Sequence, residues 1–167
     1  MLVIENLIKK YGDFTAVDNI SLEIREGDIY GFVGPNGAGK TTTMRIAATL
    51  MEATSGTVLV DGIDVREDYL KVRGKIGYMP DFFGVYDNLK VDEYMDFYGS
   101  CYGLSRAERE KRTDELLELV NLRDKKDSYV DTLSRGMKQR LCLARSLIHN
   151  PELLILDEPA SGMDPRA

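Results

Sequence analysis

The sequence contains few of the residues from which metal centres and disulfide frameworks are built. Among 167 residues there are two cysteines, Cys101 and Cys142, and a single histidine, His149. Two thiols and one imidazole are too few for a disulfide scaffold or a structural zinc site. We therefore expect both cysteines to be reduced, small buried side chains. His149 directly precedes an Asn-Pro pair, so we expect it at the end of a helix, beside the last carbonyl groups.

Long apolar runs and an excess of basic charge are also missing. No apolar stretch is long enough to cross a bilayer, and the opening MLVIENLIKKYG lacks the basic and then apolar pattern of a signal peptide. Lysine and arginine number 22 against 28 acidic residues, a formal net charge of −6. This balance disfavours a nucleic acid as partner, because a phosphate backbone requires a basic face. We expect a cytoplasmic protein that reaches a membrane only through another polypeptide.

The most informative segment that is present is GPNGAGKT, residues 34–41. It matches the G-x-x-x-x-G-K-[ST] pattern of phosphate-binding loops, in which glycines let backbone N–H groups approach a polyphosphate. Lys40 would supply a mobile positive charge to the β- and γ-phosphates, and the Thr41 hydroxyl would be a ligand of Mg²⁺. An ordinary glycine-rich turn is the alternative. The predicted ATP-binding residues here are Gly34, Asn36, Gly37, Ala38, Gly39, Lys40, Thr41 and Thr42.

The apolar pattern around this loop predicts an α/β protein. Residues 29–33, just before the loop, form a run typical of a buried strand, and residues 42–50 predict a helix. Further strands are predicted at 3–8, 20–24, 56–60, 76–79 and 153–156. A capping box at 105–108 and an apolar face formed by Met137, Leu141, Ala144 and Ile148 predict later helices. We expect a β-rich start, a parallel α/β core and a helical insert at about 85–132.

An acidic pair ends the last predicted strand. Asp157 and Glu158 follow four apolar residues, and the carboxyl ends of strands face the crevice where open α/β sheets bind ligands. Asp157 is therefore predicted to hold Mg²⁺, and Glu158 is the candidate general base for a hydrolytic water. A turn that merely begins with acidic residues is the alternative.

Three further segments complete a family pattern. Leu133–Met137, with the sequence LSRGM, precedes a predicted helix, Ser161–Asp164 follows the acidic pair, and Tyr11 lies upstream of the phosphate loop. With these segments in this order, the chain resembles the ATP-binding subunits of ABC transporters over essentially its whole length. The resemblance implies a P-loop NTPase core with a mainly parallel sheet, an N-terminal antiparallel β subdomain and a helical insert.

The same resemblance implies roles for individual residues. Tyr11 would stack on adenine, as aromatic side chains do with bases. Ser134, Arg135 and Gly136 would form the signature segment, which contacts ATP held by a second copy of the domain. Asp164 would communicate across that dimer. The implied partners are thus a second nucleotide-binding domain and a transmembrane permease subunit on a separate chain.

The sequence departs from the family pattern in three places. The signature usually reads LSGGQ, whereas LSRGM is similar to single-domain ATPases that power drug- or ion-exporting pumps. Asp81 stands where the family usually has glutamine and would face Mg²⁺ together with Thr41 and Asp157. The family's switch histidine follows the acidic pair by one strand, but His149 precedes that pair. We therefore expect residues 1–167 to be one C-terminally truncated nucleotide-binding domain that lacks this strand.

The expected function is ATP binding and hydrolysis that powers a separate membrane subunit, with export favoured. A non-transport ATPase of the same family and a binding module without turnover are the alternatives, the latter because the switch histidine is missing. The apolar loop Phe82–Tyr86 has two interpretations: it docks the transmembrane partner, as the resemblance implies, or it caps the core of the helical insert. The transported substrate is not encoded here, because its pocket would lie in another polypeptide.

Overall fold

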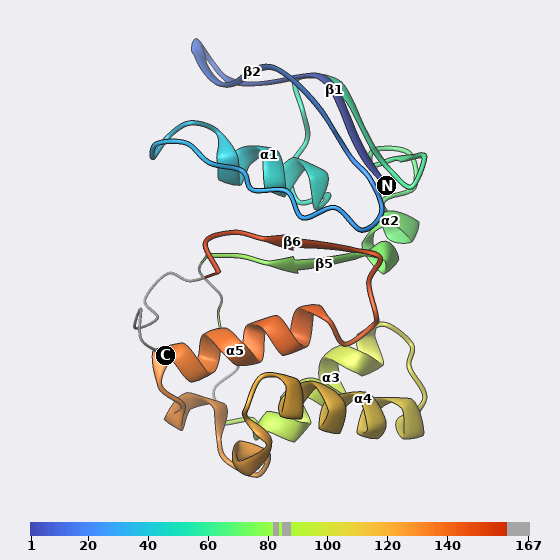
Figure 1. Cartoon of the computed structure of the whole chain (residues 1–167), viewed down its shortest axis with the longest axis vertical. Coiled ribbons are helices and arrows are strands. Elements are labelled where there is room, and N and C mark those ends of the chain that lie inside the picture. The colour runs from blue at the N-terminus through green and yellow to red at the C-terminus, as the bar shows by residue number, and fades with distance from the viewer. Residues whose placement is uncertain (82–83, 85–87, 160–167) are drawn as a thin grey trace. The chain divides into compact units, whose positions relative to one another are not determined.

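The computed structural model describes residues 1–81, 84 and 88–159 and divides the chain into two compact units, Met1–Ile76 and Gly77–Ala167. Figure 1 shows the helices and strands of both units, coloured along the chain from blue at the N-terminus to red at the C-terminus. Among the helices of the described ranges, none has both the length and the apolar composition to span a lipid bilayer.

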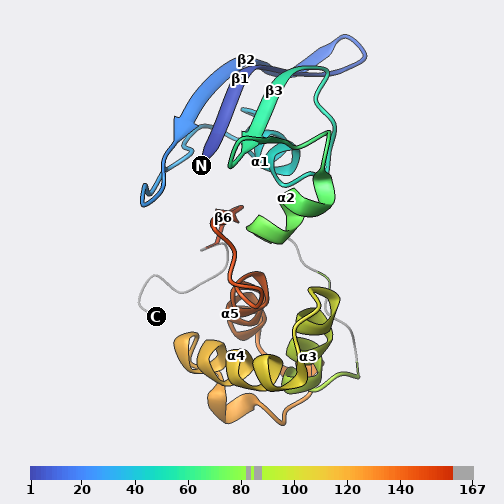
Figure 2. The same ribbon diagram turned by 90° about the vertical axis from the view of Figure 1, so that its right-hand side faces the viewer.

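The first unit is built on a four-stranded antiparallel sheet in the order β2-β1-β3-β4. Its strands are β1 (Leu2–Tyr11), β2 (Phe14–Ile24), β3 (Ser55–Val60) and β4 (Ile63–Asp64). Helix α1 (Lys40–Ala47) packs against β2 and β3 (Figure 2). Ile46 of α1 and Val58 of β3 are both almost fully buried, so the helix closes the apolar face of the sheet.

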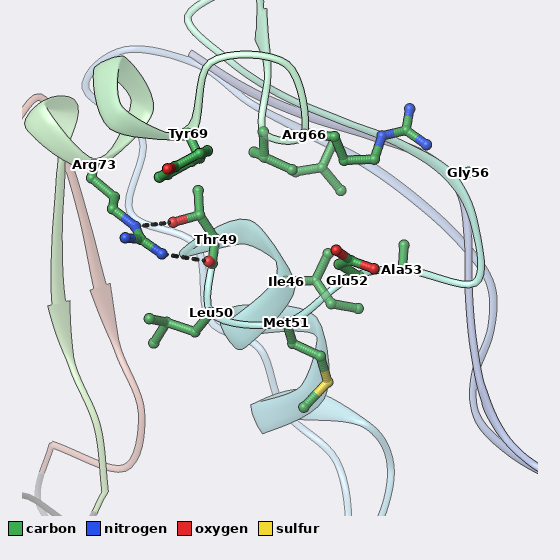
Figure 3. Close-up of a pocket in the computed structure, with 12 residues that line it drawn as sticks. Ile46, Thr49, Leu50, Met51, Glu52, Ala53, Gly56, Arg66, Tyr69 and Arg73 are labelled. Atoms are coloured by element: carbon green, nitrogen blue, oxygen red, sulfur yellow. Dashed lines mark hydrogen bonds between the residues drawn. The ribbon is translucent and has the colours of Figure 1, made fainter.

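A second helix of this unit, α2 (Tyr69–Lys75), is tied to the end of α1. Asp68 caps α2 by accepting a hydrogen bond from the Lys71 backbone N–H at 3.1 Å. The Arg73 guanidinium donates to the Thr49 hydroxyl at 2.7 Å and to the Thr49 carbonyl at 3.1 Å (Figure 3). Arg73 therefore satisfies a carbonyl just beyond the C-terminal end of α1, where backbone acceptors lack helical partners.

The second unit combines a short sheet with helices. Strands β5 (Ile76–Met79) and β6 (Leu153–Leu156) form a two-stranded sheet. The helices are α3 (Val91–Cys101), α4 (Arg106–Leu119) and α5 (Arg135–Ser146), with short 3₁₀ turns η1 (Arg123–Lys125) and η2 (Val130–Thr132). Their shared core consists of Val91, Tyr94, Met95, Leu116, Leu117, Val120, Leu122, Val130, Leu133, Leu141, Ala144 and Ile148.

Two arginines lock α4 and α5 together. Arg140 of α5 donates to the Val120 carbonyl at 3.0 Å, at the end of α4. Arg112 of α4 donates to the Leu147 carbonyl at 2.8 Å, at the end of α5. Each helix thus supplies the cation that satisfies the other's terminal acceptors, where positive charge is favoured. The pair is fixed at both ends as well as by its apolar core.

Most elements predicted from the sequence are present. The strands predicted at 3–8, 20–24, 56–60, 76–79 and 153–156 correspond to β1, β2, β3, β5 and β6. The predicted capping box forms at α4, where Ser105 accepts a hydrogen bond from the Glu108 N–H and the Glu108 side chain accepts one from the Ser105 N–H. Leu141, Ala144 and Ile148 are fully buried, as the predicted apolar face requires.

The predicted buried strand at residues 29–33 is wrong for this structure. These residues adopt no regular secondary structure, and Ile29 and Val33 are 102% and 96% exposed. An apolar run becomes a strand only where a neighbouring strand satisfies its backbone groups. None of the strands in the described residues pairs with this run.

The expectations for the sulfur-containing and imidazole side chains are met only in part. Both cysteines are free, but Cys101 is exposed, because it ends α3 away from the core, while Cys142 is buried. Burial raises the pKa of the Cys142 thiol. His149 lies just after α5, as predicted, and its ring stacks on Tyr102 with the centroids 3.7 Å apart.

Candidate nucleotide-binding site

The predicted phosphate loop leads directly into α1. Gly37 and Gly39 have φ angles of 82° and 84°, in the left-handed region that glycine enters without steric cost. Gly39 is the N-cap of α1 and contributes no side-chain hydrogen bond. The residue at the N-cap therefore offers no side chain to satisfy the first N–H groups of α1. N–H groups at a helix N-terminus without such a cap can bind an anion.

Lys40 lies folded over this loop. Its Nζ donates to the carbonyls of Gly34 at 2.8 Å and Pro35 at 2.9 Å. These contacts keep the ammonium group on the loop side of α1, where its charge adds to the positive end of the helix dipole. The loop thus concentrates positive charge at one place on the surface of the first unit.

Gly39 is fixed by packing as well as by its backbone angle. A Cβ atom at Gly39 would lie 2.3 Å from the Ala16 carbonyl oxygen on β2, whereas a Cβ at Gly37 would meet no atom within 4 Å. The phosphate loop therefore rests directly on the backbone of β2. Gly37 and Gly39 thus share a left-handed backbone conformation, but only Gly39 must also lack a side chain in order to pack against β2.

We expect Gly39→Ala to destabilise the protein far more than Gly37→Ala. Both substitutions put a side chain in the left-handed region, at a cost of about 1–2 kcal/mol. Only Gly39→Ala adds a backbone clash, and overpacking costs about 1–3 kcal/mol more. Urea unfolding of the two variants measures the difference. Equal losses would contradict the contact between loop and strand.

Tyr11 lies at the end of β1, in the same unit as the loop. It pairs with Phe14 across the hairpin, which places it near the stretch of β2 on which Gly39 rests. Its ring is about half exposed, and its hydroxyl contacts the Met51 sulfur at 3.0 Å. Because Met51 lies beyond the C-terminal end of α1, opposite the end that carries the phosphate loop, this contact does not itself place the ring at the loop, and the predicted stacking on a base stays a prediction.

One pocket in the first unit lies away from the phosphate loop. It has a volume of about 360 Å³ and lies at the other end of α1, lined among others by Ile46, Leu50, Val65 and Tyr69 (Figure 3). None of the site residues predicted from the sequence lines it. The predicted phosphate contacts lie instead on a loop of which residue 34 is partly exposed and residues 36–38 are exposed, while Gly39 is buried.

The acidic pair follows β6, as predicted. Asp157 is only 2% exposed, and its backbone N–H donates to the Met79 carbonyl of β5 at 2.9 Å. Asp81 follows Met79 by two residues, so both predicted metal ligands of this unit come from the same end of the short sheet. Glu158 is exposed and has a φ of 52°, which turns the chain sharply after the buried aspartate.

The signature segment begins α5. Ser134 is the N-cap, and its hydroxyl accepts a hydrogen bond from the Met137 N–H at 3.3 Å. Arg135 is the first helical residue, and a Cβ atom at Gly136 would meet nothing within 4 Å. The helix N-terminus is therefore open on this side, as the predicted contact with a phosphate requires.

One residue on this helix has a contact that the sequence pattern did not predict. The Gln139 amide reaches the backbone just after Glu158. The one sequence signal that could have suggested this contact is the position of Gln139, five residues after Ser134 on the same helix. In the structure this position is on the buried side of α5. Two other predicted segments, Asp164 and the loop Phe82–Tyr86 apart from Gly84, lie outside the described residues.

Two features define the class of the protein. A glycine-rich loop caps α1 next to the antiparallel sheet, and an acidic pair follows β6 beside the capped helix α5. These are the features of a P-loop nucleotide-binding protein of the α/β class. The family model for ABC transporters matches residues 17–161. The chain therefore belongs to the ABC transporter family.

Two curated relatives and one solved structure illustrate the match. Nod factor export ATP-binding protein I of Cupriavidus metallidurans is 41% identical over 167 residues, which cover 100% of this chain and 55% of that protein. Methionine import ATP-binding protein MetN of Geobacillus kaustophilus is 42% identical over 174 aligned positions, covering 99% and 51%. The chain thus spans about half the length of these two relatives.

The structural comparison gives the same family. MJ0796, a bacterial ABC transporter cassette whose structure is dimeric, superimposes with a TM-score of 0.89 at 31% identity, covering 99% of this chain and 77% of that one. The predicted fold class, a P-loop core with an antiparallel β subdomain and a helical insert, is confirmed.

Proposed function

We propose that the protein binds and hydrolyses ATP and thereby powers a separate transmembrane permease, with export as the favoured direction. The observation that carries the proposal is the presence in one chain of the phosphate loop, the acidic strand end and the signature helix. The name of the Nod factor relative supports export, whereas the methionine relative supports import. The LSRGM signature favours the first of these.

Each predicted site residue would have its own part in ATP binding or hydrolysis. Lys40 and the loop glycines would bind the phosphates, and Tyr11 would stack on adenine. Glu158 would take a proton from water as the water oxygen bonds to the γ-phosphorus, while the bond to the β–γ bridging oxygen breaks and releases ADP. The positive N-terminal end of α1 would stabilise the charge that spreads over the transferred phosphoryl group.

The chemistry of the side chains fits Mg²⁺. Thr41, Asp81 and Asp157 offer a hydroxyl and two carboxylates, the oxygen ligands that this ion prefers. Among the described residues, no cluster of three or more His, Cys, Asp or Glu side chains could hold a metal on its own, so the ion would depend on phosphate oxygens as well. When bound, Mg²⁺ neutralises part of the phosphate charge.

The open N-terminus of α5 supports a dimer. Ser134, Arg135 and Gly136 would contact ATP held by a second copy, and two-fold symmetry would then give two equivalent sites. Asp164 would join these sites. The dimeric cassette structure is consistent with this arrangement for its own family member. Through the permease, the protein would lie on the cytoplasmic face of the membrane, with no nucleic acid involved.

A binding module without turnover is the second candidate, alongside a non-transport ATPase. Steady-state phosphate release by the full-length subunit separates an ATP-hydrolysing transporter subunit from a binding module without turnover. If hydrolysis needs two copies, the rate should rise with the square of the subunit concentration at low concentration. Nucleotide binding without any phosphate release would favour the binding module.

A further inference from the structure

We infer that Gln139 is a positioning residue for hydrolysis: it holds the backbone turn that carries Glu158 and connects this turn to the signature segment on the same helix. The inference rests on the proposed function, because it takes Glu158 as the general base. Nothing in the sequence pattern assigns a role to this side chain.

The contact itself is specific. Gln139 is 4% exposed, and its Nε2 donates to the Pro159 carbonyl at 2.6 Å and lies 3.5 Å from the Glu158 carbonyl. A buried amide that donates to backbone nineteen and twenty residues away fixes that backbone. The Glu158 turn is thus held by a side chain from α5.

The turn needs such support. The φ of 52° at Glu158 lies in a region that residues other than glycine rarely adopt, and such conformations persist where the surroundings determine them. On one side, the Asp157 N–H is bonded to Met79 of β5 at 2.9 Å. On the other side, Gln139 holds the carbonyls that follow. The Glu158 carboxylate therefore projects from a backbone fixed at both ends.

Only the donor half of the amide carries this contact. The Gln139 Oε1 is buried and has no hydrogen-bond partner among the described residues. A role in packing alone would not distinguish the amide from an apolar side chain of similar size. The interaction is therefore sensitive to the loss of the Nε2 donor in particular.

Helix α5 connects this contact to the signature segment. Gln139 follows the N-cap Ser134 by five residues, about 7.5 Å along the helix axis. Leu141 and Ala144 are fully buried, and Arg112 binds the Leu147 carbonyl at the far end. A displacement of Ser134 on contact with ATP of a second copy would therefore move Gln139, and with it the Glu158 turn.

The test uses three variants of the full-length subunit. Gln139→Met keeps the volume and removes the donor, so kcat should fall about tenfold while the KM for ATP stays within twofold. Gln139→Glu places a carboxylate against two carbonyls at pH 8. Because burial raises the pKa of a carboxyl group, this variant should regain a donor as the pH falls to 6. Lys111→Met, an exposed change on α4, is the matched control.

The pH profile distinguishes positioning from a structural role. The kcat of Gln139→Glu, relative to the unsubstituted subunit, should rise between pH 8 and pH 6, whereas the ratio for Gln139→Met should stay flat. Unchanged kcat in Gln139→Met, or identical profiles for the two variants, would overturn the inference.

A second measurement does not depend on turnover. Hydrogen exchange of the peptide covering residues 153–159 should be at least fivefold faster in Gln139→Met than in the unsubstituted subunit, without change in the peptide covering α4. Unchanged exchange would overturn the inference even if the subunit hydrolyses ATP. A subunit that never hydrolyses ATP would refute the proposed function, yet this measurement would still decide whether Gln139 holds the turn.

Discussion

Replacing Glu158 by glutamine in the full-length subunit should abolish ATP turnover and leave an ATP-bound dimer that does not dissociate. The substitution keeps the shape of the side chain but replaces the basic carboxylate by an amide, which is too weak a base to take a proton from water. General-base catalysis contributes about a hundredfold to ten-thousandfold to a rate, so kcat should fall by at least a hundredfold. Because ATP would favour the paired state and hydrolysis would release it, the dimer should persist.

Light scattering at saturating Mg-ATP measures the assembly, and phosphate release measures the rate. Glu152→Gln is the control, because Glu152 is another exposed acid that lies just before β6. A monomer in the Glu158→Gln variant would show that Ser134 does not face a second nucleotide. Normal turnover would remove Glu158 from the role of base.

Loss of the Lys40 charge should weaken nucleotide binding more than any other single change in the phosphate loop. Lys40→Ala removes a full positive charge from a site for a polyanion, while the glycine backbone remains. A charge-assisted hydrogen bond contributes about 1.5–3 kcal/mol, which corresponds to a loss of about tenfold to a hundredfold in affinity.

Calorimetric titration with Mg-ATP measures this loss. The folded structure should survive, because the bonds of the Lys40 ammonium, among the residues that the structure describes, go to the carbonyls of Gly34 and Pro35 within the loop itself. Lys111→Ala, a change of the same charge on exposed α4, should bind ATP normally. Equal affinity of the Lys40 variant and the unsubstituted subunit would refute the assignment of the loop.

The sequence was a good guide wherever a signal is local. The capping box at Ser105 and the helical spacing of Leu141 and Ala144 each predicted an element that the structure contains. The run at residues 29–33 misled because strand formation depends on a neighbouring strand as well as on apolar composition. Cys101 was predicted to be buried and is exposed, since a single residue type does not reveal which side of a helix faces the core.

In the candidate site, too, local features were predictable from the sequence, whereas contacts between distant segments were not. The glycines of the phosphate loop and the position of Asp157 at a strand end are local features and were predictable. The backbone conformation of Glu158 and its contact with Gln139 join segments that lie nineteen residues apart. Such a contact depends on tertiary packing, which a single sequence does not reveal.

The exposed run at residues 29–33 has a consequence for the chain in a cell. An apolar run with Ile29 and Val33 accessible to solvent is exposed apolar surface of the kind that marks either an interaction site or a tendency to aggregate. Steady-state levels of a protein with such a segment depend on capture and release by chaperones and on proteolysis.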